Sequence, residues 1–233
     1  MNVLIPAFLV LESGLFPYNT PMKRTIIFGD IHGCFDEWEM LLKKVNATSQ
    51  DHLIAVGDLI FKGPSSKRVL EKAYGMPNLQ CIIGNHELRL LKSWKERKLE
   101  QLHKPYQTDF LKEMKDSLDK FAKWLDTWPY FIDTPDYLVI HAGLRPNIPL
   151  KKQDPFDLTH LRKLEPEDKP WYEFYKEKKL IIHGHWAAQG LVVRDNVIGL
   201  DSGCVYGKQL SCVILPERQI VQVNAKRVYQ PID

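Results

Sequence analysis

Two side chains that bind metal ions well lie two residues apart in the segment Gly29-Asp30-Ile31-His32-Gly33. The segment follows a β-prone run, residues 25–28, and side chains two apart in an extended chain point to the same side. The Asp30 carboxylate and the His32 imidazole can therefore reach one cation. The two glycines let the backbone turn sharply where a strand gives way to a helix. The spacing predicts half of a metal site in a strand-to-helix turn.

The same order of strand, polar turn and helix follows twice more along the chain. Apolar runs at 52–56 and 79–83 are followed by Gly57-Asp58 and by Gly84-Asn85-His86-Glu87. Apolar residues at helical spacing come after each turn, over 35–45, over 65–74 and from residue 88 onward. Ligands bind at the carboxyl ends of strands in open α/β sheets. We therefore expect Asp58 and Asn85 to lie near Asp30 and His32.

The second half of the chain is rich in strand-like segments. Runs at 137–140 and 179–182 end at His141 and at His183-Gly184-His185, and a short helix is predicted over 157–164. Hairpin-like strands finish the chain, at 192–193, 197–200, 211–215 and 219–223. Parallel βα units followed by an antiparallel set predict an α/β fold with two sheets packed face to face and helices outside. Residues 88–128, with dense mixed charge and helical spacing, predict a helical insertion.

Six side chains at or just beyond the ends of these apolar runs form a candidate metal centre: Asp30, His32, Asp58, Asn85, His141 and His185. Oxygen and imidazole ligands without thiolate favour two divalent ions, with Mn²⁺ as the first choice and Fe, Zn or Co as alternatives. Asp30 and His32 would hold one ion and Asn85, His141 and His185 the other, with Asp58 bridging them. Because only two ligands are negative, the centre would stay positive enough to hold a bridging hydroxide and a phosphate oxygen.

The ordered motifs GDIHG, GDLIFKG, GNHE, HAG and GHW resemble those of the binuclear metallophosphoesterases of the phosphoprotein phosphatase superfamily, related to calcineurin-like enzymes. The resemblance implies a four-layer α/β/β/α sandwich formed by one domain, residues 22–233. It also implies the ligand roles given above. It adds His86 as an acid that protonates the leaving oxygen without binding metal, and Arg162 as a phosphate clamp.

Two departures inside the motifs narrow this interpretation. Phe61-Lys62 stands where protein phosphatases of the superfamily have an Asp-Arg pair, so the carboxylate that would orient the catalytic histidine is missing. Lys62 can still neutralise phosphate, but as a point charge and not as a bidentate fork. The segments 184–187 and 200–207 instead resemble the symmetrical diadenosine tetraphosphatases, and above all their shorter phosphatase relatives.

The sequence thus predicts a metal-dependent phosphoesterase in which a hydroxide bridging two metals attacks a nucleoside polyphosphate or another small phosphate. The first alternative is a serine/threonine protein phosphatase that uses the same site on phosphoproteins. The second is an inactive metal- or partner-binding module. Assays of diadenosine tetraphosphate against phosphopeptides would discriminate between the first two.

The remaining features of the chain are less specific. The net charge of +3 comes from well-mixed acidic and basic residues and indicates neither nucleic acid nor membrane as a partner. Four scattered cysteines without a CxxC pair indicate reduced core thiols in a cytoplasmic protein.

Residues 1–21 are expected to be an N-terminal extension, because Met22 would itself make a natural start. Tyr206 is equally consistent with the core and with the border of the pocket. A structural role is expected for four histidines, His52, His103, His160 and His183.

Overall fold

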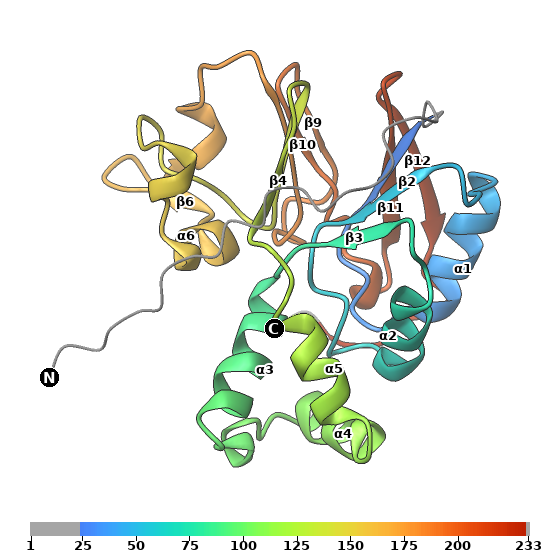
Figure 1. The fold of residues 1–233 in the computed structure, drawn as a ribbon. Coiled ribbons are helices and arrows are strands. Elements are labelled where there is room, and N and C mark those ends of the chain that lie inside the picture. The colour runs from blue at the N-terminus through green and yellow to red at the C-terminus, as the bar shows by residue number, and fades with distance from the viewer. Residues whose placement is uncertain (1–23, 232–233) are drawn as a thin grey trace, which may run out of the picture.

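The computed structural model describes residues 24–231 and contains two five-stranded sheets packed face to face (Figure 1). The predicted extension, residues 1–21, lies outside the described residues. The first sheet has the order β12-β11-β1-β2-β3, with β1 Thr25–Phe28, β2 His52–Ala55, β3 Leu79–Cys81, β11 Gln209–Leu215 and β12 Gln219–Asn224. The second has the order β4-β5-β8-β10-β9, with β4 Phe131–Asp133, β5 Tyr137–Ile140, β8 Leu180–His183, β9 Val192–Val193 and β10 Val197–Gly199.

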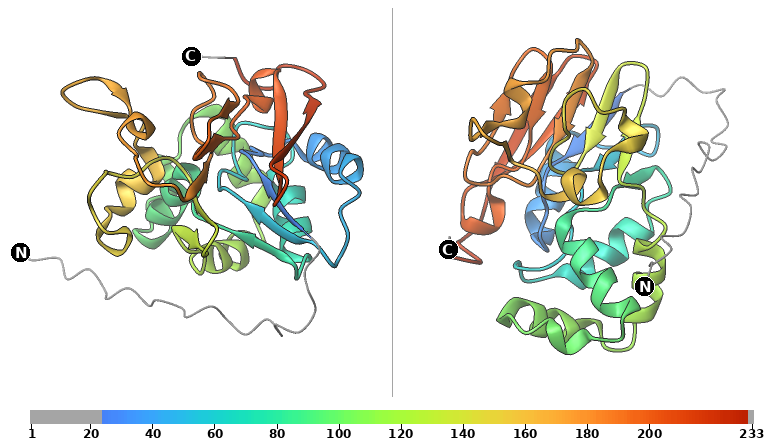
Figure 2. Two further views of the ribbon diagram at one scale, coloured as in Figure 1. Left: turned by 90° about the horizontal axis from the view of Figure 1, so that it is seen from above. Right: turned by 90° about the vertical axis from the view of Figure 1, so that its left-hand side faces the viewer.

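Helices cover the outer faces of both sheets, which gives the α/β/β/α order of layers (Figures 1 and 2). The helices are α1 Phe35–Lys44, α2 Ser66–Tyr74, α3 Asn85–Lys95, α4 Pro105–Met114, α5 Leu118–Leu125 and α6 Pro155–His160. The described residues also form four 3-10 turns, η1 Leu99–Gln101, η2 Leu150–Lys152, η3 Trp171–Glu173 and η4 Cys204–Tyr206. A two-stranded ribbon consists of β6 Lys163–Leu164 and β7 Lys169–Pro170. Helices α1 and α2 lie beside the first sheet, and α6 lies on the far side of the second.

The central strands read as unbroken apolar runs because both of their faces are buried. In β1, Ile26 and Phe28 belong to the cluster under the helices, whereas Ile27 between them belongs to the cluster between the sheets. In β8, Ile182 faces the first sheet and Ile181 faces the outer layer. Each sheet is therefore held by two apolar layers, and its strand ends are fixed firmly enough to position polar side chains.

Helices α3, α4 and α5 lie together beneath the two sheets, in the stretch where the helical insertion is predicted (Figure 1). Leu90, Phe110 and Phe121, one from each helix, are buried in the cluster that also contains the helix-facing residues of β1. This packing joins the helical stretch to the core of the first sheet. The division of the chain into an extension and one domain stays a prediction.

The C-terminal hairpin β11–β12 belongs to the first sheet, although the chain reaches it directly after the second. Strand β11 runs antiparallel to β1, with Ile27 opposite Val213. Both sheets are consequently mixed, with three parallel strands and antiparallel neighbours in each.

The helix predicted over 157–164 is displaced toward the N-terminus, since α6 spans Pro155–His160. Asp154 caps it by accepting a hydrogen bond from the Phe156 N–H at 2.8 Å, and Pro155 occupies its first turn, where a missing N–H costs nothing. Arg162 therefore lies in the segment after the helix and not on it.

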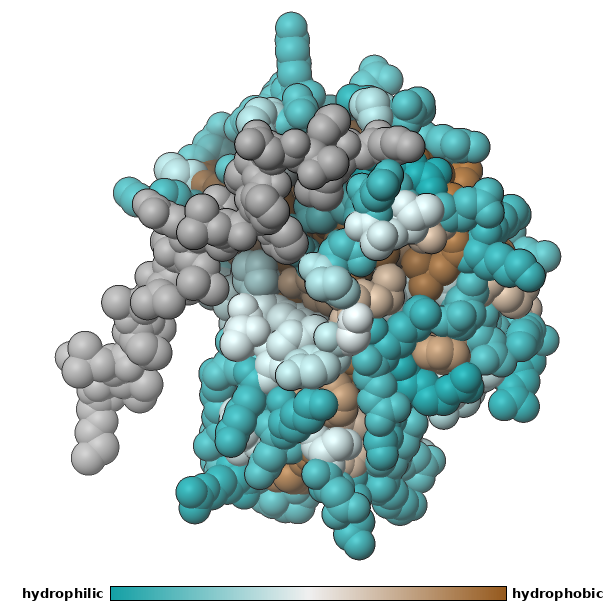
Figure 3. Space-filling view, turned by 45° about the vertical axis from the view of Figure 1, so that its right-hand side comes forward, coloured by the Kyte–Doolittle hydropathy of each residue, from teal (hydrophilic) through white to brown (hydrophobic). Residues whose placement is uncertain are grey.

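All four cysteines are buried and none forms a disulfide, as predicted. In the described part of the chain, no helix combines the length and the apolar character that a membrane span requires. The face in Figure 3 is mostly hydrophilic, with small and separate hydrophobic patches.

Candidate metal centre and active-site pocket

Six parallel strands, three from each sheet, end at the same edge of the molecule and deliver the candidate ligands there. In the first sheet β1, β2 and β3 are parallel, and they lead into Asp30, Asp58 and Asn85. In the second sheet β5, β8 and β10 are parallel, and they lead into His141, His185 and Asp201. The face-to-face packing of the sheets thus brings together side chains that are far apart in the sequence.

Three of the histidines have one ring nitrogen against a backbone carbonyl and the other directed into the site. The carbonyl partners are Ile60 O for His32 Nδ1 at 3.1 Å, Val56 O for His141 Nδ1 at 2.7 Å and His160 O for His185 Nε2 at 3.2 Å. A carbonyl can only accept, so each outer nitrogen carries a proton, and in the neutral form of each ring the inner nitrogen keeps its lone pair. Metal-binding histidines are oriented in this way.

The inner nitrogens of His141 and His185 converge on the side chain of Asn85. Asn85 Oδ1 lies 3.0 Å from His141 Nε2 and 2.7 Å from His185 Nδ1. Asp58 Oδ2 is 3.5 Å from His141 Nε2 and 3.6 Å from His32 Nε2. Asp58 consequently stands between the His32 side and the His141 side of the site.

Two groups of side chains each lie close enough together to bind one ion, and Asp58 belongs to both groups. His32, Asp58 and His86 form one group, and Asp58, His141 and His185 form the other, with ligand atoms within 4.8 Å of one another in each. Asp30 lies outside both groups, and its two oxygens accept the His185 backbone N–H, each at 3.1 Å. His86, predicted as a non-ligand, lies inside the first.

The backbone at the site is strained and close-packed. His32, Asp58 and His185 all have positive φ, of 46°, 51° and 69°, which is uncommon for residues other than glycine and clusters at functional sites. A Cβ on Gly84 would lie 2.2 Å from Asp58 Oδ1, and one on Gly184 would lie 1.9 Å from Asp30 Oδ1. Both glycines are needed because the carboxylates occupy the space of a side chain.

Three buried carboxylates, Asp30, Asp58 and Asp201, meet at this edge. Burial and the neighbouring Asp201 hold the pKa of Asp30 well above its usual value, and burial raises the pKa of Asp201 to about 6. Burial would also raise the pKa of Asp58, but His141 and His86 hold it well below its usual value. These acids repel one another, so added cations would relieve a cost that is built into the fold.

Two of the three imidazoles are neutral, and the third would become neutral on binding a cation. Burial lowers the pKa of His32 to about 3 and that of His185 well below its usual value, so both rings are neutral. Burial would lower the pKa of His141 as well, but Asp58 and Asp30 raise it to about 10. A divalent ion would displace the His141 proton and take over its charge. The donor set therefore fits divalent cations.

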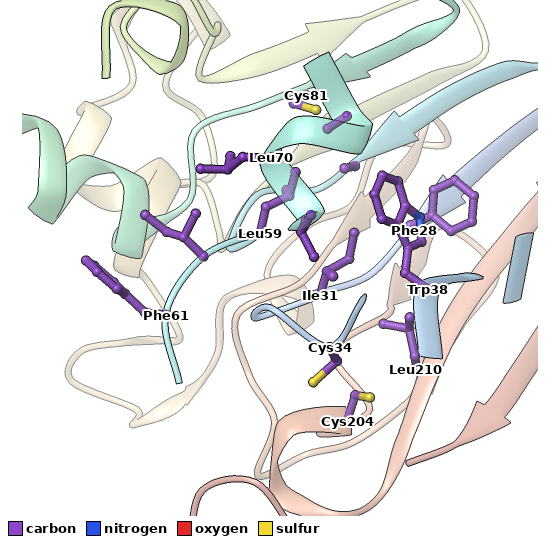
Figure 4. Packing of buried hydrophobic residues seen from close by; sticks show 14 of the residues in the cluster. Phe28, Ile31, Cys34, Trp38, Leu59, Phe61, Leu70, Cys81, Cys204 and Leu210 are labelled. Carbon is purple, nitrogen blue, oxygen red and sulfur yellow. The ribbon is translucent and has the colours of Figure 1, made fainter. Parts of the chain in front are cut away.

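His86 differs from the other histidines in having no orienting partner. Its backbone N–H donates to Asp58 Oδ1 at 2.9 Å, and its Nε2 is 3.9 Å from Asp58 Oδ2. Its buried Nδ1 has no hydrogen-bond partner in the described part of the chain. The fully buried ring of Phe61, labelled in Figure 4, packs edge-on against the His86 ring, with ring centroids 5.7 Å apart.

The predicted phosphate-binding side chains line a cavity of about 470 Å³ over the ligands. Lys62 Nζ donates to the Tyr206 hydroxyl at 2.9 Å and lies 3.5 Å from His32 Nε2. Burial would lower the pKa of Lys62, but Asp58 and Tyr206 raise it, so the lysine is charged. Arg162 reaches the same cavity and donates to His185 O at 3.3 Å.

Two acids in the site were missed as functional residues by the sequence reasoning. Glu87 is fully buried and accepts from the backbone N–H groups of Asp58 and Leu59, each at 2.8 Å, so it shapes the loop that carries Asp58. Asp201 is the first polar residue after β10 and lines the cavity. The rule that located the other ligands, a polar residue just after an apolar run, applies equally to Asp201.

Two basic side chains from the helical stretch were missed as well. Arg89 on α3 and Lys104 just before α4 line the same cavity. Dense charge over 88–128 gave no means of separating these two from solvent-exposed residues. The four histidines expected to be structural do not line the cavity, whereas Tyr206 does.

Comparison with known proteins agrees with this geometry. The family described as calcineurin-like phosphoesterase matches residues 23–220. The symmetrical bis(5'-nucleosyl)-tetraphosphatase of Vibrio parahaemolyticus is 28% identical, with 86% of this chain and 98% of that protein aligned.

Two solved structures show the same architecture. A crystal structure of a protein proposed to be a diadenosine tetraphosphatase is 32% identical, covers 87% of this chain and 93% of its own, and superposes with a TM-score of 0.75. A serine/threonine phosphatase from Saccharomyces cerevisiae, 16% identical, covers 93% of this chain and 82% of its own with a TM-score of 0.59, a likeness of fold alone. The family match, the sequence motifs and the six converging strand ends agree. This chain belongs to the calcineurin-like phosphoesterases.

Proposed function

We propose that this chain hydrolyses a nucleoside polyphosphate or a related small phosphate with the help of two divalent cations. The observation that carries the proposal is the composition of the cavity over the candidate ligands. Four cationic side chains line it, Lys62, Arg89, Lys104 and Arg162, together with the aromatic rings of Tyr106, Trp186 and Tyr206. Several separate cations suit a chain of phosphates, and aromatic rings suit a nucleobase.

Each polar side chain then has a role that follows from its position. Asp30 and His32 would hold one cation, Asn85, His141 and His185 the other, and Asp58 both. When bound, such cations supply Lewis acidity at phosphorus and lower the pKa of water to near neutrality. Lys62 and Arg162 would neutralise the charge that develops on the phosphoryl oxygens.

His86 would deliver a proton to the leaving oxygen. Burial lowers the pKa of His86 well below its usual value, and Asp58 raises it only in part. A negatively charged phosphate beside the ring would favour its protonated form. With no carboxylate at Nδ1, His86 is an acid suited to a phosphate leaving group, which needs less proton donation than a serine alkoxide. This supports a polyphosphate over a phosphoprotein as substrate.

The longer relatives named as tetraphosphatases do not by themselves define the substrate. The alignment with the Vibrio protein extends over 271 positions, more than the 233 residues of this chain, although 98% of that protein is included. That protein therefore has internal segments with no counterpart here. The cavity of this chain therefore provides its own set of substrate contacts.

A substrate panel tests the proposal. The purified protein, loaded with Mn²⁺ and separately with Zn²⁺ or Co²⁺, is assayed with diadenosine tetraphosphate, ATP, an aryl phosphate and phosphoserine peptides. We expect the highest kcat/KM for a nucleoside polyphosphate. A higher value for phosphopeptides would identify a protein phosphatase, and no phosphate release from any compound with any metal would identify an inactive binding module.

A further inference from the structure

A second group of metal-binding side chains lies outside the candidate active site. Cys34, at the start of α1, lies beside Cys204 of η4 (Figure 4), and Glu37 in the first turn of α1 belongs to the same group. The two sulfurs and one carboxylate oxygen lie within 4.8 Å of one another. All three residues are buried, with exposed fractions of 0%, 2% and 0%. None of them lines the cavity over the candidate metal centre.

The Glu37 carboxylate is only half satisfied by the protein. Its Oε1 accepts from the Tyr229 hydroxyl at 2.7 Å and from the Lys226 backbone N–H at 2.9 Å. Its Oε2 is buried and has no hydrogen-bond partner among the described residues. A buried carboxylate oxygen without a partner costs free energy, and two thiols beside it offer no positive charge to balance it. A bound cation would satisfy this oxygen and balance its charge.

We propose that Cys34, Cys204 and Glu37 bind one thiophilic divalent cation of the Zn²⁺ class, separate from the cations of the candidate active site. On binding, the two thiols release their protons to solvent and both sulfurs and Glu37 Oε2 bind the ion, which leaves a fourth tetrahedral position to water. Two thiolates select Zn²⁺ over Mn²⁺, whereas the oxygen and imidazole ligands of the active site suit both.

Such an ion would connect two loops that border the cavity. Cys34 is two residues beyond His32, and Cys204 is two residues before Tyr206, whose hydroxyl accepts from Lys62. The ion would thus hold the first metal loop against the loop that positions Lys62. This consequence rests on the proposed phosphate-binding role of Lys62, whereas the site itself does not.

Cobalt titration of the full chain under reducing conditions provides the test, because thiolate bound to Co²⁺ gives a near-ultraviolet charge-transfer band and oxygen or imidazole ligands do not. We expect this band to saturate at an intensity that corresponds to one thiolate-bound Co²⁺ per chain, while the active site binds its own cobalt without contributing to the band, and to be bleached by Zn²⁺. The Cys34→Ser/Cys204→Ser variant should lose the band and one equivalent of bound cobalt. The control, Cys81→Ser/Cys212→Ser, removes two buried cysteines outside the cluster and should keep both.

A milder variant keeps the test valid where the double serine variant does not fold. Glu37→Gln retains both thiols and the acceptor for Tyr229, and it should weaken cobalt affinity, read from the band, by about tenfold or more. A missing band in the native protein, or an unchanged affinity in Glu37→Gln, would overturn the proposal. A Cys34–Cys204 disulfide found by mass spectrometry under the same reducing conditions would overturn it too. Because the readout is spectroscopic, an inactive enzyme would not affect the result.

Discussion

Buried acids at the two ends of the first sheet differ in whether the chain stabilises their charged form. At the amino ends of β1 and β2, Asp51 is 2% exposed and pairs with Arg24, with Arg24 Nε 2.8 Å from Asp51 Oδ1. The Thr48 backbone N–H adds a hydrogen bond at 2.7 Å. At the carboxyl ends, His141 and His86 stabilise the charge of Asp58, whereas Asp30 meets another buried acid, Asp201, and its charged form is disfavoured.

The pKa values express the same difference. Burial would raise the pKa of Asp51, but Arg24 and Thr48 hold it below its usual value of 3.8, whereas burial and Asp201 raise that of Asp30. A charge balanced within the chain contributes to stability. A buried acid whose charged form has too little compensation within the chain is typical of functional sites, and here the surrounding ligands indicate divalent cations as the missing partners.

The largest effect is expected at the point where both candidate ions would meet. Asp58→Asn removes a negative charge from between two cations, so at least one should be lost. Loss of a side chain that merely orients a ligand already costs roughly 10- to 100-fold in affinity or activity. The loss in kcat/KM should therefore exceed about a hundredfold, measured beside metal content by elemental analysis. Near-normal turnover with both metals retained would show that Asp58 does not bridge.

His86→Asn should act on the chemical step while leaving the metals in place. General acid catalysis contributes roughly 10²- to 10⁴-fold, so an alkyl phosphate should lose about that much in kcat. An aryl phosphate with an acidic phenol needs little protonation and should be spared. Single-turnover rates on both substrates provide the measurement, and equal losses would contradict the acid role.

Asp51→Asn tests the ion pair between Asp51 and Arg24 at the amino ends of β1 and β2. It should lower the free energy of unfolding by about 1 to 3 kcal/mol near neutral pH, the usual range for hydrogen bonds to a charged group, and leave kcat/KM of the folded protein unchanged. Because the folded-state pKa of Asp51 is depressed, its stabilisation is complete above the unfolded value and is lost as the pH falls through the folded value. Denaturation curves should converge below about pH 4. A constant difference down to lower pH would contradict the pairing.

Asp30→Asn makes the same substitution at the carboxyl ends of the strands. In chelator, this variant should unfold at a temperature equal to or above that of the native chain, because it removes an acid whose charged form is disfavoured by burial. Added Mn²⁺ should raise the melting temperature of the native chain and raise that of the variant less. A variant clearly less stable in chelator would mean that the chain itself stabilises the charge of Asp30.

The smallest effect is expected from Phe61→Asp, which would provide the missing partner for His86 Nδ1. A carboxylate there would fix the ring and raise the pKa of its imidazolium, which helps most with a basic leaving group. The ratio of kcat/KM for phosphoserine peptide to that for diadenosine tetraphosphate should rise several-fold. Phe61→Leu, with the same loss of the ring and no charge, is the control for packing. An unchanged ratio in a folded, metal-loaded variant would remove residue 61 from the determinants of substrate class.

The sequence could predict which side chains converge at this edge because local rules govern their placement. Asp30, Asp58, Asn85, His141 and His185 each follow an apolar run, and parallel strands end at a common edge. Those rules did not state which sheet the last hairpin would join, because the pairing of β11 with β1 is a long-range contact. The bounds of α6 were wrong because the cap at Asp154 was not recognised.

The substrate side was less predictable because it depends on tertiary packing. Glu87 looks like an ordinary first-turn acid until the loop around Asp58 folds over it. Arg89 and Lys104 sit among many similar charges, and only the placement of α3 and α4 selects them for the cavity. The unpartnered Nδ1 of His86, in contrast, agrees with the prediction made from Phe61.

Electron paramagnetic resonance of the Mn²⁺-loaded native chain, read beside its metal content, tests the central claim most directly. A pair of Mn²⁺ ions joined by Asp58 should give about two equivalents per chain and the multiline signal of two coupled spins. Asp58→Asn should lose that coupling. Two uncoupled ions, or saturation at one equivalent with full activity, would contradict a centre bridged by Asp58.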